Sequence, residues 1–108
     1  MKTQHKNLEE RWSNLSFFEQ MANIGSEVER ALSWQVKGNS QYCLLAFERS
    51  LELLDFTTDG IKELHRLTEL KRLREALVDY FIYNNTYGSS AGSWHNYFFA
   101  FNYAARAI

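Results

Sequence analysis

The chain of 108 residues contains no proline, one cysteine and only five glycines. The single cysteine, Cys43, excludes an intramolecular disulfide and a zinc site built on several cysteines. Twelve Lys and Arg residues against thirteen Asp and Glu residues give a net charge of −1, so no overall charge attracts nucleic acid or an anionic membrane. No apolar run approaches the roughly 20 residues of a membrane-spanning helix, and residues 1–11 are too polar for a secretory signal. We therefore expect a reduced, cytoplasmic protein without a membrane partner.

Apolar residues make up 45% of the chain and charged residues 23%, which is enough for a real core and a solvated surface. The length is that of one domain. We expect residues 16–108 to form that domain and residues 1–15 to form an N-terminal extension or short helix.

Apolar residues recur at the three- and four-residue steps of amphipathic helices in four segments, which are 8–37, 40–56, 61–83 and 94–108. Ser16 and Glu19 have the spacing of a capping box, so the main helix of the first segment is expected to begin at Phe17. Gly25 lies in the middle of that helix, where it could mark a close crossing with another helix. The other glycines, Gly38, Gly60, Gly88 and Gly92, lie where the helical patterns stop. These features predict an all-α, up-and-down four-helix bundle with short loops.

The histidines lack the surroundings of a metal or catalytic site. A two-metal centre in a helical bundle uses Glu-x-x-His, whereas Glu63 precedes His65 by two residues and His95 has no carboxylate within four positions. Cys43 lies in an apolar stripe, where a cysteine usually behaves as a small buried hydrophobe. We therefore predict no catalytic residues, no metal and no cofactor.

Residues 86–93 are small and polar and predict a loop before the last helix, with Ser93 as its N-cap. This loop has two glycines but no following lysine, so it is not a nucleotide-binding loop of the P-loop kind. An alternative role is an anion site made by the N-terminal amides of the last helix near Ser93 and Trp94.

The third helical segment carries a run of basic residues. They form a candidate face for an anionic partner, made of Lys62, Arg66, Lys71, Arg72 and Arg74. Binding to phosphates requires several such contacts to converge, and acidic residues interrupt this run. A solvated face with ion pairs is the favoured interpretation, and a surface for nucleic acid or an acidic partner is the alternative.

The last segment is unusually aromatic, with six aromatic residues between positions 94 and 103. Successive helical residues differ by about 100°, so these rings cannot share one face. Phe98 and Phe101 define one face, whereas Phe99 and Tyr103 lie on another. A second aromatic face favours self-association. One alternative is a monomer in which the other helices surround the last helix on all sides. The other is a platform on which the bases of single-stranded nucleic acid stack. The candidate interface comprises Trp94, Tyr97, Phe99, Tyr103, Tyr80 and Tyr83.

In its size and four-helix layout, the segment 16–108 resembles small bacterial helical-bundle proteins of the HEPN type, which tend to dimerise. Catalytic members of that superfamily cleave RNA with an Arg followed four to six residues later by a His. No arginine of this chain has a histidine at that distance. The resemblance therefore implies a binding role without catalysis.

Three functional hypotheses follow. The first is a non-enzymatic, self-associating helical bundle, with a dimer favoured, that serves as a protein-protein adaptor or binding module in a bacterial-type cytoplasm. The alternative is an RNA-directed protein, either a regulator or a nuclease, that uses the basic third helix. The third is a small-molecule pocket among the aromatic residues of the third and fourth helices.

Overall fold

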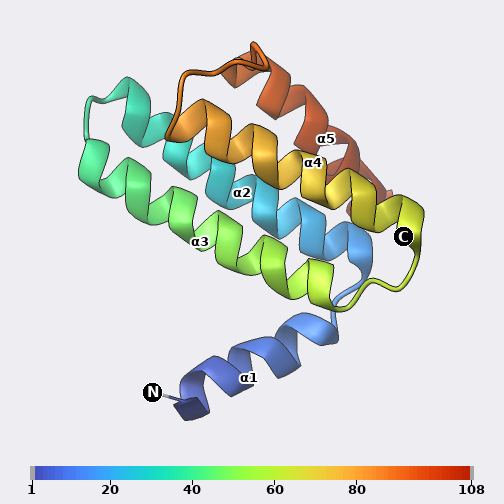
Figure 1. Cartoon of the computed structure of the whole chain (residues 1–108). Helices are drawn as coiled ribbons and strands as arrows, with labels where there is room; N and C mark the ends of the chain where they lie inside the picture. The colour runs from blue at the N-terminus through green and yellow to red at the C-terminus, as the bar shows by residue number, and fades with distance from the viewer. Residues whose placement is uncertain (1, 108) are drawn as a thin grey trace.

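The computed structural model describes the backbone of residues 2–107 and the side chains of residues 8–107. Four main helices follow a short N-terminal one, as Figure 1 shows. They are α1 (Lys2–Ser13), α2 (Phe17–Val36), α3 (Ser40–Asp59), α4 (Leu64–Phe81) and α5 (Ala91–Ala107). The predicted all-α bundle is confirmed. None of the described helices is long and apolar enough to cross a membrane.

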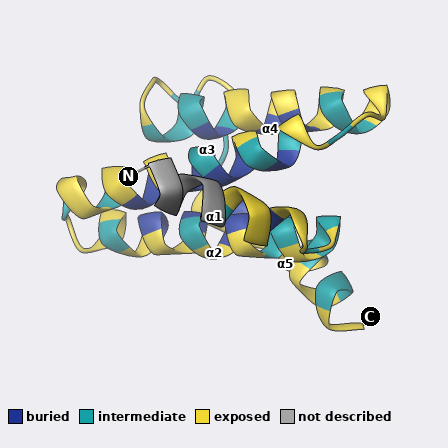
Figure 2. Cartoon of the chain, turned by 90° about the horizontal axis from the view of Figure 1, so that it is seen from below, coloured by how far each residue is buried: buried dark blue, intermediate teal, exposed yellow. Residues whose placement is uncertain are grey.

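Helix α2 is the centre of the bundle, with α3 on one side and α5 on the other. Helix α4 packs on α3, and α1 lies across the end of α3. Figure 2 shows that buried residues face the interior of this arrangement and exposed residues face outward. The largest fully buried side chains are Met21, Ile24, Val28, Leu54, Leu70 and Leu77, from α2, α3 and α4.

The start of α2 is fixed by its own sequence. The Glu19 amide donates to the Ser16 hydroxyl at 3.1 Å, and the Ser16 amide donates to the Glu19 carboxylate at 2.9 Å. These reciprocal bonds form the predicted capping box. Hydrogen bonds from the Ser16 backbone and side chain hold the pKa of Glu19 below its ordinary value.

Gly25 allows α2 and α5 to pack closely. A Cβ atom at this position would lie 2.7 Å from Cβ of Phe98 and 2.8 Å from its Cγ. Ordinary contacts between carbon atoms are about 3.5–4.0 Å. The predicted close crossing at Gly25 is therefore confirmed, and its partner is α5.

Several helix boundaries differ from the sequence-based prediction. Helix α3 continues to Asp59 instead of ending near Phe56, because Thr57 is buried and its hydroxyl accepts a hydrogen bond from Trp12 Nε1 at 2.9 Å. Helix α4 begins at Leu64 rather than Ile61 and ends at Phe81 rather than Tyr83, and its N-cap Glu63 has an extended backbone. The contact of Trp12 with α3 also shows that the N-terminal segment packs on the bundle.

A further difference is at the start of α5, where the N-cap is Ser90 rather than Ser93. The Ser93 amide donates to the Ser90 hydroxyl at 3.1 Å, and the Ser90 amide donates to the Ser93 hydroxyl at 2.9 Å. The preceding loop is held by Asn85, whose side chain bonds both the amide and the carbonyl of Ser89. Asn85 adopts a φ of 52°, a conformation that asparagine tolerates better than most residues. This ordered loop fixes where α5 begins relative to α4.

Candidate functional site

Helix α5 has an inner and an outer face. Trp94 and Phe98 are buried against the rest of the bundle, and Phe101 packs edge-on against Phe17 at a ring distance of 6.0 Å. On the opposite side, Phe99 is 58% exposed and Tyr103 is 68% exposed. The predicted division of the aromatic residues between two faces is confirmed, because the helical period of 3.6 residues places them so.

The outer face of α5 is aromatic and almost uncharged. We define it as Gly92, His95, Phe99, Tyr103 and Arg106, which recur at three- and four-residue steps. The His95 ring lies 6.3 Å from the Phe99 ring, so the aromatic stripe continues toward the start of the helix. Between Ala91 and Ala105 the sequence has no Asp, Glu, Lys or Arg. Depletion of charge together with aromatic enrichment is typical of protein interface cores.

A shallow hollow adjoins this face, between α2 and α5. Its volume is about 430 Å³, and it is lined by Glu29, Ser33 and Val36 of α2 and by Gly92 and His95 of α5. His95 Nδ1 lies 3.0 Å from the Glu29 carboxylate, which fixes the ring at the edge of the hollow. Val36 is highly exposed here, so the hollow offers apolar surface to a side chain from another molecule.

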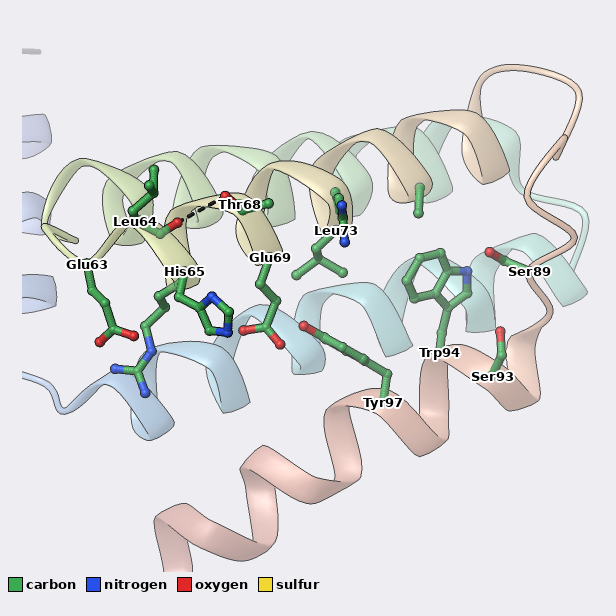
Figure 3. A pocket seen from close by; sticks show the side chains of 13 residues that line it. Glu63, Leu64, His65, Thr68, Glu69, Leu73, Ser89, Ser93, Trp94 and Tyr97 are labelled. Atoms are coloured by element: carbon green, nitrogen blue, oxygen red, sulfur yellow. Dashed lines mark hydrogen bonds between the residues drawn. The ribbon is translucent and has the colours of Figure 1, made fainter.

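A larger groove, of about 1220 Å³, separates α4 from α5 (Figure 3). Its α4 wall extends from Glu63 to Ala76, and its α5 wall carries Trp94 and Tyr97. The groove exists because α4 packs mainly on α3 whereas α5 packs mainly on α2, so different partners hold the two helices apart. It lies between the third and fourth segments of the predicted bundle, where the third functional hypothesis places a pocket. That hypothesis did not include Ser89, which lines the groove from the loop.

Two polar atoms of the α5 wall are buried without a hydrogen-bond partner among the described residues. They are Nε1 of Trp94 and the hydroxyl oxygen of Tyr97. A buried polar group without a partner costs about 1–3 kcal/mol, so a ligand that forms a hydrogen bond with either atom removes this cost. Figure 3 shows the indole nitrogen of Trp94 turned toward Ser89 and the Tyr97 hydroxyl turned toward Glu69.

The hydroxyl of Tyr97 stays protonated over the physiological range. Burial, and in addition the charge of Glu69, raise the pKa of Tyr97 well above its ordinary value. Tyr97 can therefore donate a hydrogen bond, and the indole N–H of Trp94 can only donate.

The six residues of the predicted interface do not form one surface. Trp94 is only 5% exposed, so its side chain is not available to a partner at the surface of this fold. Tyr97 faces the groove. Tyr80 packs edge-on against Trp94 at 6.1 Å and donates a hydrogen bond to Gln35 of α2.

Tyr83, which follows α4, lies beside Val78 and Tyr87 in a separate hollow. Only Phe99 and Tyr103 of the six therefore lie on the outer face of α5.

The basic residues of α4 also lie apart. Arg66 and Arg72 line the groove, and the Arg66 guanidinium lies 4.0 Å from the centre of the Phe17 ring. Arg74 instead pairs with Asp55 of α3, at 3.0 Å. Lys62 precedes the helix and Lys71 is exposed. The structure does not gather these five residues into one face, so the RNA-directed role stays a prediction.

The remaining candidate groups are isolated. Within residues 8–107, no three His, Cys, Asp or Glu side chains are placed to hold a metal ion. Cys43 is half-buried in α3, and burial raises the pKa of its thiol. This raised pKa disfavours the reactive thiolate.

Comparisons with protein-family models, with curated proteins and with solved structures each found no match to this chain. The resemblance to HEPN-type proteins therefore stays an expectation that rests on chain size and helix layout.

Proposed function

We propose that the protein is a non-enzymatic binding module, an adaptor whose copies pair through the outer face of α5. The observation that carries this proposal is the exposure of Phe99 and Tyr103 on a stripe with little charge. Burying aromatic side chains of this size supplies most of the energy of typical interfaces. A surface that binds nucleic acid would need several cations, and this stripe has only Arg106.

The outer face suits a second copy of the same chain. Phe99 is the middle residue of α5, which spans Ala91–Ala107. In an antiparallel, two-fold pair of α5 helices, Phe99 lies next to its own copy at the symmetry axis. Tyr103, four residues after the axis, then lies opposite His95, four residues before it.

The hollow between α2 and α5 supports the same pairing. His95 lines that hollow, so the pairing directs the exposed Tyr103 ring of each copy toward the hollow of the other. The ring would cover Val36, and its hydroxyl would come near the Glu29 carboxylate. Because the pair has two-fold symmetry, each of these contacts forms twice. The α5 stripe has no Asp or Glu, so the pairing brings no two acidic groups together along it.

Disulfide cross-linking tests the register of this pair. Packed helices have axes about 8–10 Å apart and Cα radii of about 2.3 Å, so facing Cα atoms come within the reach of a disulfide. In a background of Cys43→Ser, Phe99→Cys is expected to give a covalent dimer under mild oxidation. Tyr103→Cys alone should not, whereas a mixture of Tyr103→Cys and His95→Cys should.

Tyr83→Cys is the matched control, because Tyr83 is 70% exposed but lies off the α5 stripe. Equal cross-linking of Phe99→Cys and Tyr83→Cys would reject the proposed face, since random collision would then account for both.

A further inference from the structure

The groove between α4 and α5 has the features of a small-molecule site. Its volume of about 1220 Å³ exceeds the roughly 300–1,000 Å³ of typical ligand pockets. Leu73 and Trp94 are buried at its base, and Ala76 and the Tyr97 ring add half-buried apolar surface. An apolar organic body of one or two rings therefore fits along it.

At one end of the groove lies a buried hydrogen-bond donor that has no acceptor among the described residues. The Trp94 side chain is only 5% exposed, and its Nε1 has no partner among the described residues. In Figure 3 this nitrogen faces the side chain of Ser89, whose hydroxyl is a second donor. Helix α5 begins beside them at Ala91, and the positive end of its dipole favours a negative group here.

The charges along the groove fix the orientation of a ligand. Glu69 faces Tyr97, away from Ser89, and would repel an anionic group at that position. Arg72 lines the groove one turn closer to Ala76, so an anion at the Trp94 end gains a cation nearby. The donors and the charges therefore both favour a ligand whose anionic group lies at the Trp94 end of the groove.

We propose that this groove binds an amphipathic carboxylic acid. Its carboxylate accepts hydrogen bonds from Trp94 Nε1 and from the Ser89 hydroxyl, and its apolar body lies along Leu73, Ala76 and the Tyr97 ring. Because Trp94 Nε1 is buried without a partner among the described residues, the ligand satisfies a donor that the free protein leaves unpaired. The site uses the inner edge of α5 and is independent of the pairing through its outer face.

Titration of the full-length protein with naphthoate, followed by nuclear magnetic resonance of the indole N–H groups, tests the site. The chain has three tryptophans, and Trp94→Phe identifies the Trp94 signal. Naphthoate is expected to shift that signal in a saturable manner. The Trp12 signal should stay fixed, because its N–H already bonds Thr57 at 2.9 Å. A Trp94 signal that does not move, or that moves without saturating, would overturn the proposal.

Variants and a neutral analogue separate the contributions. Trp94→Phe keeps an aromatic ring, although a smaller one, and loses the donor, and should weaken naphthoate binding by about tenfold or more. Trp34→Phe, at the far end of α2, is the control and should leave affinity unchanged. The uncharged naphthamide should bind at least about tenfold more weakly than naphthoate. Equal affinities in either comparison would contradict the assignment of the carboxylate to Trp94.

A further variant fills the groove. Ala76→Phe adds a ring at the half-buried base and is expected to abolish naphthoate binding while the helical circular dichroism is retained. Undiminished binding by the folded variant would place the ligand elsewhere. If Ala76→Phe does not fold, the Trp94→Phe and naphthamide comparisons decide the question by themselves.

Discussion

Replacing Gly25 by alanine tests how closely α2 and α5 pack. The added Cβ would lie 2.7 Å from Cβ of Phe98 and within 2.9 Å of Cδ1 of the same ring. Rotating the ring does not move Phe98 Cβ, so the two helices must separate locally by about 1 Å to restore a normal contact. Overpacking of this kind costs about 1–3 kcal/mol.

Helix propensity acts in the opposite direction at this position. Alanine is about 1 kcal/mol more favourable than glycine in a helix interior. The net expectation for Gly25→Ala is a loss of up to about 2 kcal/mol in the free energy of unfolding. Ser26→Ala is the control, since Ser26 is exposed on the same turn and the change should stabilise slightly.

Urea denaturation followed by circular dichroism measures both variants, at one fixed protein concentration because pairing would make stability depend on concentration. If Gly25→Ala were more stable than the wild type by the full gain of about 1 kcal/mol that helix propensity alone gives, the close contact between Gly25 and Phe98 would not exist in solution.

Two further predictions concern local contacts. Ser16→Ala removes the N-cap of α2 and should lower stability by about 1 kcal/mol at neutral pH. Because the folded state lowers the pKa of Glu19, the stabilisation by its carboxylate is complete above the ordinary value of 4.5 and is lost as the pH falls through the lowered value. Ser16→Ala keeps the backbone N–H of Ser16, which is the larger cause of that lowering, so Glu19→Gln is the variant that tests the pH dependence. The stability difference between wild type and Glu19→Gln should shrink in acid, and a difference that grows in acid would contradict the capping box. Trp12→Phe leaves the buried Thr57 hydroxyl without its donor and should cost about 1–3 kcal/mol in the same urea assay. An unchanged midpoint would mean that α1 does not pack on α3.

Local patterns were sufficient to predict part of the fold. The start of α2 depends on Ser16 and Glu19, three residues apart, so the sequence alone reveals it. The two faces of α5 follow from helical geometry, because Phe99 and Tyr103 share one side whatever lies against the other. Gly25 indicated a close crossing, although its partner Phe98 became evident only in the fold.

Other features depend on contacts between distant residues. Helix α3 extends past Phe56 because Trp12, 45 residues from Thr57 in the sequence, bonds the Thr57 hydroxyl. The groove arises because α4 and α5 pack on different neighbours, which amphipathic periodicity does not specify. Trp94 was predicted as an interface residue, but its burial depends on where α4 lies.

The most direct test of the proposed pairing is the solution mass of the wild-type protein, measured by light scattering on a sizing column. We expect twice the chain mass of 12.7 kDa, and a return to the chain mass for Tyr103→Glu. Tyr83→Glu, at a side chain of similar exposure, should remain a dimer. A wild-type protein that elutes with the mass of a single chain at all concentrations tested would contradict self-association through α5.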